Sequence, residues 1–115
     1  RAWARAIAHE MHGGFQTLRQ VCPQTIKERF PSYDYSKAAG DIARIENLWS
    51  LCLDFHHTQG PFLFGDFSLA DCMYAPIVNR FRTYDIKVSE KSRSYMNTML
   101  AHPFMKEWEA EALQE

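Results

Sequence analysis

The chain has 115 residues and a formal net charge of -1, with 13 Lys and Arg residues against 14 Asp and Glu residues. This length supports one globular domain, and a content of 46% hydrophobic and 14% aromatic residues excludes a disordered or fibrous protein. Because the sequence shows neither a basic run nor an apolar run long enough to span a bilayer, it predicts no nucleic-acid partner and no membrane association.

The cysteines and the start of the chain indicate where the protein works. Cys22, Cys52 and Cys72 lie far apart and form no C-x-x-C pair, so neither a disulfide framework nor a metal site is expected. Reduced thiols are typical of a cytoplasmic protein. The chain begins at Arg1, without Met and inside an amphipathic pattern, so we expect it to be a fragment of a longer protein.

The first predicted helix runs from Ala2 to about Gln20, because apolar residues recur there every three or four positions. These apolar residues are Trp3, Ile7, Met11, Phe15 and Leu18. The segment from Gln24 to Tyr35 is predicted to be a loop that its aromatic residues hold in place, although a loop of this length can also be functional.

The rest of the chain reads as four more helices. The second runs from Ser36 or Asp41 to His57, with an apolar face of Ile42, Ile45, Leu48, Trp49, Cys52 and Phe55. The third spans Leu69 to about Tyr84 and is kinked at Pro76, the fourth begins after Ser89 and reaches about Leu100, and the fifth begins at Pro103. The sequence therefore predicts an all-α bundle of about five helices, a single domain over residues 1–115.

The start of the third helix carries the most specific local signal. In the stretch Gly65-Asp66-Phe67-Ser68-Leu69-Ala70-Asp71, Ser68 stands at the N-cap and Asp71 three residues later, which predicts a capping box. The helix that follows is apolar on every face, so we expect it to be buried all round, at the centre of the bundle. Water cannot satisfy the first N–H groups of such a helix, and the box supplies partners for them.

Two motifs together resemble a known family. The capping box resembles that of the C-terminal, all-helical domain of cytosolic glutathione transferases. Glu10-Met11-His12-Gly13-Gly14-Phe15 resembles the Glu-x-His-x-Gly-Phe segment in the first helix of that domain in bacterial, beta-like members, which also carry a Trp at the position of Trp3. Gly13 departs from the pattern, because beta members carry a Lys there.

The resemblance implies an enzyme that conjugates the glutathione thiolate to electrophilic small molecules, acts as a homodimer, serves detoxification and needs no cofactor besides glutathione as co-substrate. It implies that Glu10 contacts the glutathione held by the opposite subunit and that His12 faces the thiol in its own subunit, as a glutathione-binding and catalytic residue. Met11 and Phe15 would belong to the hydrophobic-substrate wall. The thiol-activating Ser, Tyr or Cys would lie in an N-terminal thioredoxin-like domain that this chain lacks, so the chain alone is expected to be inactive.

Helical geometry bears on these two roles. At about 100° per residue, Glu10 and His12 project about 160° apart, so a single ligand cannot easily meet both from one helix. This is compatible with contacts to two different subunits, but also with a Glu10 that pairs with a local cation and a His12 in solvent. The alternative function is a non-catalytic helical interaction module with the same fold, and sequence upstream of Arg1 would distinguish the two.

Overall fold

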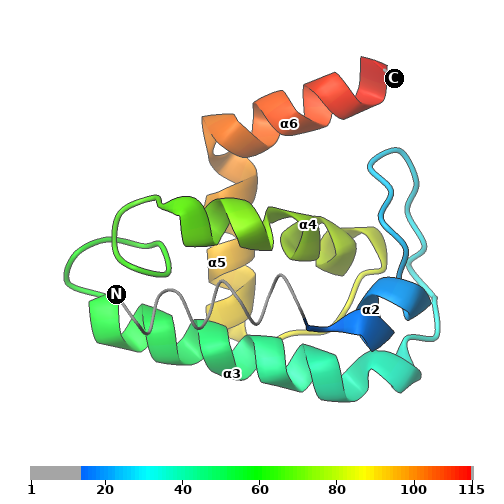
Figure 1. Cartoon of the computed structure of the whole chain (residues 1–115), viewed down its shortest axis with the longest axis horizontal. Coiled ribbons are helices and arrows are strands. Elements are labelled where there is room, and N and C mark those ends of the chain that lie inside the picture. Colours follow the sequence, from blue (N-terminus) through cyan, green and yellow to red (C-terminus); the bar gives the residue numbers. More distant parts are fainter. Residues whose placement is uncertain (1–13, 115) are drawn as a thin grey trace.

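The structure is a computed structural model that describes residues 14–114, so Trp3, Glu10, Met11 and His12 lie outside the described residues. Within this range it contains five α-helices, labelled α2 to α6, and no β-strand (Figure 1). The prediction of an all-α bundle is confirmed.

Helix α2 spans Gln16–Val21 and is much shorter than predicted from the sequence. The expected continuous helix to Gln20 is wrong, because Gly14 is not helical and Phe15 adopts left-handed backbone angles of φ 60° and ψ 33°. The adjacent glycines of the sequence explain the break, since each costs a helix about 1 kcal/mol relative to Ala. The first turn of α2 gains a remote partner instead: the Leu18 N–H donates to Asp41 Oδ2 at 2.9 Å.

The loop between α2 and the next helix is held in place, as predicted, partly by its aromatic residues. Tyr33 packs on Tyr84 with ring centroids 4.6 Å apart, and its hydroxyl donates to the Val21 carbonyl. Phe30 stacks on the same Tyr84, and the Phe30 N–H donates to the Thr83 carbonyl at 2.7 Å.

Side chains from the end of α4 hold the beginning of this loop. The Thr25 carbonyl accepts from Asn79 Nδ2 at 2.8 Å and from Thr83 Oγ1 at 3.0 Å. Arg80 Nε donates to the Cys22 carbonyl at 2.9 Å, and the Tyr84 hydroxyl donates to the Pro23 carbonyl at 2.7 Å. Two adjacent pairs of residues at the end of α4 and just after it thus satisfy three loop carbonyls that would otherwise need water as a partner.

After a 3-10 turn at Ser36–Ala38, helix α3 spans Ala39–His56. Five of the six residues predicted for its apolar face are buried: Ile42, Ile45, Leu48, Trp49 and Cys52. The sixth assignment is wrong, because the Phe55 side chain is 75% exposed. Phe55 continues the helical period into the last turn of α3, where the core no longer covers that face.

Helix α4 spans Leu69–Thr83 and occupies the centre of the bundle, as predicted. After Leu69, which is 73% exposed, no residue of α4 is exposed. Pro76 lies inside the helix, where it removes one backbone donor. Figure 1 shows α4 between α3 and α6, with α5 crossing it.

Helices α5, Glu90–Ala101, and α6, Pro103–Gln114, complete the described fold. Ser89 caps α5 by accepting from the Ser92 N–H at 3.2 Å, and Pro103 is the first residue of α6. Arg82 joins α4 to α6 through an ion pair with Glu109 at 2.8 Å. Within the described residues, no helix is both long and apolar enough to cross a membrane.

Candidate functional site

The carboxylate of Asp71 is the centre of a buried hydrogen-bond network at the start of α4. Both halves of the capping box are present, and the Ser68 N–H donates to Asp71 Oδ2 at 2.9 Å. The Ser68 hydroxyl also donates to Oδ2, at 3.3 Å. The Asp71 N–H additionally reaches the Ser68 carbonyl at 3.0 Å. The serine hydroxyl is therefore oriented by the carboxylate as much as by the helix.

The second oxygen of Asp71 binds two groups that lie outside its helix. Oδ1 accepts from the Tyr95 hydroxyl of α5 at 2.7 Å and from the Leu63 N–H of the preceding turn at 3.3 Å. Asp71 is fully buried, so these donors are what makes a carboxylate tolerable at this depth. One side chain thus joins the start of α4, the turn before it and the middle of α5.

Tyr95 extends this network into the aromatic core. Its ring lies 4.8 Å from that of Trp49, centroid to centroid, and Trp49 also contacts Tyr74 and Phe81. Burial, followed by the adjacent Asp71 carboxylate, raises the pKa of the Tyr95 hydroxyl well above its ordinary value. The hydroxyl consequently stays protonated and acts as a donor.

The turn before α4 is shaped by two glycines. Gly65 has φ 91°, and the Phe62 and Gly65 N–H groups each donate to the other's carbonyl at 3.0 Å. A Cβ at Gly60 would lie 2.3 Å from the Gly65 carbonyl oxygen, which excludes any side chain there. This close approach fixes the position of Pro61, which lines a pocket next to the turn.

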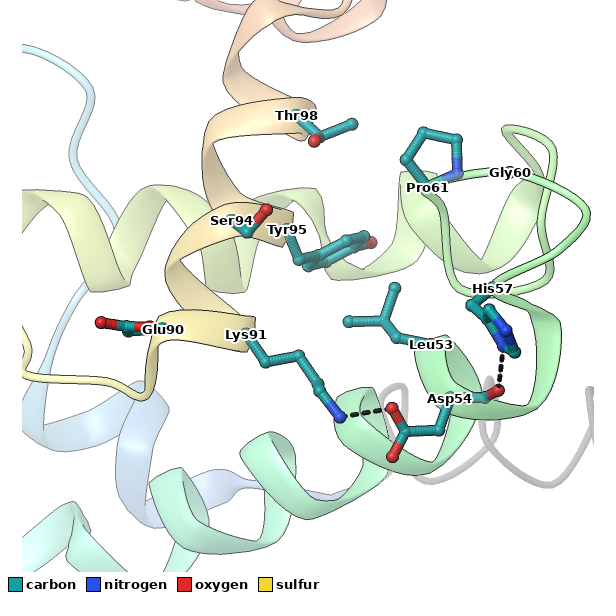
Figure 2. Close-up of a pocket in the computed structure, with 10 residues that line it drawn as sticks. All are labelled: Leu53, Asp54, His57, Gly60, Pro61, Glu90, Lys91, Ser94, Tyr95 and Thr98. Carbon is teal, nitrogen blue, oxygen red and sulfur yellow. Dashed lines mark hydrogen bonds and ion pairs between the residues drawn. The ribbon is translucent and has the colours of Figure 1, made fainter.

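The pocket lies between the end of α3, this turn and α5, and has a volume of about 630 Å³ (Figure 2). Leu53, Pro61 and Tyr95 give it apolar walls, and Ser94 and Thr98 add two hydroxyl groups from α5. Its size lies within the range of about 300–1,000 Å³ that is usual for small-molecule sites.

The charged groups of the pocket lie at its edge. Lys91 Nζ forms an ion pair with Asp54 Oδ1, and these two side chains are 43% and 64% exposed. The His57 ring donates from Nδ1 to the Asp54 carbonyl at 2.9 Å. In Figure 2 the Glu90 carboxylate points away from Leu53, His57 and Pro61.

The three thiols are arranged for packing rather than for chemistry. Cys22 and Cys52 are buried, and Cys72 is half-buried. Burial and the nearby Asp71 charge raise the pKa of Cys52 to about 11, and burial also raises the pKa of Cys22 and of Cys72. Within residues 14–114 no group of His, Cys, Asp and Glu side chains could hold a metal ion.

Only some of the predicted site residues lie in the part of the chain that the structure describes. Glu10, Met11 and His12 lie outside the described residues, so their roles stay predictions. Phe15 lies in the hydrophobic core and is 7% exposed, which leaves little of its ring for a substrate; its place in a substrate wall also stays a prediction.

Sequence reasoning identified Ser68 and Asp71 but missed the remote half of their network. Tyr95 has the local signature of an apolar residue in a helix, and nothing in the sequence pairs it with Asp71. The pocket was missed as well, since it combines three separate segments of the chain.

Comparison with known protein families gives a match. A family model described as glutathione S-transferase, C-terminal domain, matches residues 2–111. Neither the curated proteins nor the solved structures give a significant match.

Proposed function

Because the chain belongs to the family of glutathione S-transferase C-terminal domains, we propose that it is the helical domain of an enzyme that conjugates glutathione to electrophilic small molecules. The observation that carries this proposal is the family match over residues 2–111. In the proposed reaction the glutathione thiol loses its proton, and the thiolate sulfur forms a bond to the electrophilic carbon while the leaving group departs. Only the thiolate is nucleophilic, so the enzyme must lower the thiol pKa.

The residue that activates the thiol is proposed to lie in an N-terminal thioredoxin-like domain of the full-length protein. This chain would supply the helical side of the cleft and part of a homodimer interface. The Asp71 network supports that role, because it joins α4, α5 and the turn before α4 into one rigid support.

Glu10 and His12 are proposed to serve two different glutathione sites. Glu10 would contact glutathione bound to the partner subunit, and His12 would lie near the thiol in its own subunit. Loss of a charge-assisted contact costs about 1.5–3 kcal/mol, so Glu10→Gln should weaken glutathione binding about tenfold or more. His12→Ala should instead lower turnover or change its pH dependence.

Mixed dimers of the full-length protein test this assignment. One subunit carries Glu10→Gln and the other an inactive thiol-activating residue, so that the position of the damaged site is known. We expect the one active site, which lies in the Glu10→Gln subunit, to keep normal glutathione binding and rate, because its Glu10 contact comes from the partner subunit. A defect in the same subunit, or unchanged glutathione binding and rate in both variants, would contradict the assignment of these residues.

The division of labour between domains has its own test. The isolated chain should be helical and fold cooperatively, yet show no conjugation of glutathione to a chloronitroaromatic substrate. Turnover by this chain alone would overturn the proposed position of the activating residue. A full-length protein that neither binds glutathione nor turns over the substrate would instead favour a helical interaction module.

A further inference from the structure

Helix α2 begins without a side-chain cap of its own. The residue at its N-cap is Phe15, whose ring is no conventional hydrogen-bond acceptor, and the first hydrogen bond of the helix runs from the Arg19 N–H to the Phe15 carbonyl at 3.1 Å. The helical N–H groups before Arg19 therefore need partners from outside the helix. A helix of six residues is also too short to be stable by its own hydrogen bonds, so its position depends on the groups that hold it.

Asp41 supplies one of these partners from another helix. Its Oδ2 accepts from the Leu18 N–H, in the first turn of α2, at 2.9 Å, although 23 residues separate the two along the chain. Asp41 itself lies in the first turn of α3, where the partial positive charge of the helix start favours a carboxylate. Figure 1 shows α2 beside the first turns of α3, and α2 also packs against the 3-10 turn that precedes α3.

Packing and the Asp41 hydrogen bond hold α2 in different ways. Leu18 is fully buried and Phe15 is 7% exposed, so both anchor the segment in the core. Apolar packing has no direction of its own, whereas a hydrogen bond to a fixed carboxylate sets the rotation of α2 about its axis. Without the acceptor of Asp41, α2 would stay buried but could shift, and the chain would enter it at Phe15 from a different direction.

The residues closest to this anchor along the chain are those with proposed roles toward glutathione. His12 and Glu10 precede Phe15 by three and five residues, and three residues of extended chain span at most about 11 Å. The position of Phe15 therefore limits where His12 and Glu10 can lie. A displacement of about 1 Å at a reacting group can lower a rate about a hundredfold, so even a small shift of α2 would matter.

We propose that Asp41 is a positioning residue for glutathione: by fixing the start of α2, it sets the place of Glu10 and His12. The inference rests on the proposed function, since these two residues act on glutathione only there. Asp41 contacts neither glutathione nor the electrophile in this proposal and acts through the residues that it positions.

Calorimetric titration of the full-length protein with glutathione tests the proposal. Asp41→Ala should raise the Kd for glutathione about fivefold, less than the tenfold expected for the loss of the Glu10 contact itself. A purely structural defect would lower the number of binding sites and leave the Kd unchanged. Asp41→Asn keeps an oxygen acceptor for the Leu18 N–H, so its Kd should lie within about twofold of that of the unmodified protein.

Two variants serve as controls. Asp34→Ala also removes a carboxylate that accepts from a backbone N–H, that of Ser36 at 3.0 Å, but this bond does not involve α2. Asn79→Ala removes a bond between α4 and the 22–25 segment, and reports the effect of lower stability alone. Both should leave the Kd unchanged. Denaturation midpoints verify that each variant is folded during the titration.

A double-mutant cycle shows whether Asp41 acts through Glu10. In a Glu10→Gln background, Asp41→Ala should weaken binding by less than about twofold further, because the contact that it positions is already lost. An Asp41→Ala Kd equal to that of Asp34→Ala, or an undiminished effect in the Glu10→Gln background, would overturn the inference.

Amide hydrogen exchange at Leu18 provides a measurement that needs no variant. Coupling between two sites is reciprocal, so saturating glutathione should slow exchange of the Leu18 amide in the unmodified protein, by up to about fivefold. Unchanged exchange in a protein that binds and conjugates glutathione would refute the role of Asp41 and leave the proposed function intact. An unmodified protein that neither binds nor conjugates glutathione would instead refute the proposed function, and the role of Asp41 with it.

Discussion

Replacing Asp71 by Ala should destabilise the protein far more than replacing its capping partner Ser68. The substitution removes the acceptor of four hydrogen bonds that come from three segments of the chain. The most costly consequence concerns Tyr95, whose hydroxyl would remain in a site where the residue is 2% exposed. Water cannot easily replace the lost carboxylate there.

The magnitude follows from the two short bonds of Asp71, to the Tyr95 hydroxyl at 2.7 Å and to the Ser68 N–H at 2.9 Å. A buried donor left without a partner costs about 1–3 kcal/mol, so these two together predict a loss of about 2–6 kcal/mol. Ser68→Ala removes a 3.3 Å bond and half of the capping box, and should cost about 1 kcal/mol. Ser68→Thr should be mild, because it keeps the hydroxyl.

Chemical denaturation of the purified variants measures these differences, provided that the slope of unfolding against denaturant stays constant. Lys106→Ala is the surface control; Lys91 is unsuited because it pairs with Asp54. A double-mutant cycle between Asp71→Ala and Tyr95→Phe should give a coupling of at least about 1 kcal/mol. If Asp71→Ala shifts the midpoint no more than Ser68→Ala, the carboxylate is not the centre of the network and the reasoning fails.

Three further changes test other parts of the structure. Above pH 10 the Tyr95 hydroxyl keeps its proton in the folded state, whereas it loses the proton in the unfolded chain. The free energy of unfolding should therefore fall as the pH rises past 10, and it should fall less steeply in Tyr95→Phe. At pH 8 the thiolate fraction of a thiol with the pKa of Cys52 is about a hundredfold lower than that of an ordinary thiol. Cys52 should therefore react with Ellman's reagent far more slowly in the native protein than in denaturant. Equal rates would contradict its burial. Asn79→Ala, which leaves Thr25 with a single side-chain donor, should lower the free energy of unfolding by about 2 kcal/mol, and an unchanged midpoint would argue against the anchor.

Sequence alone predicted the helix starts best, because the signals that begin a helix are local. Ser68, Ser89 and Pro103 each stand within one residue of the start of a helix in the structure. The failures occur where the tertiary environment decides. Phe55 follows the period of the α3 core face, but the bundle does not extend far enough to cover it.

The break before α2 and the partner of Asp71 show two further limits. The adjacent Gly13 and Gly14 disfavour a helix within an otherwise regular helical pattern, and the structure departs from a helix at Gly14 and Phe15. The hydrogen bond between Asp71 and Tyr95 joins residues on different helices, so no local pattern contains it. The α3–α5 pocket escaped prediction for the same reason.

The side chains at the end of α4 that hold the 22–25 segment also determine how this loop can open. The Phe30 N–H, although it belongs to a long surface loop, donates to a carbonyl of the last residue of α4. Releasing it by a local fluctuation would also strain the contacts of Thr25 with Asn79 and Thr83. Amide hydrogen exchange at Phe30 should therefore be slow for a residue in a surface loop.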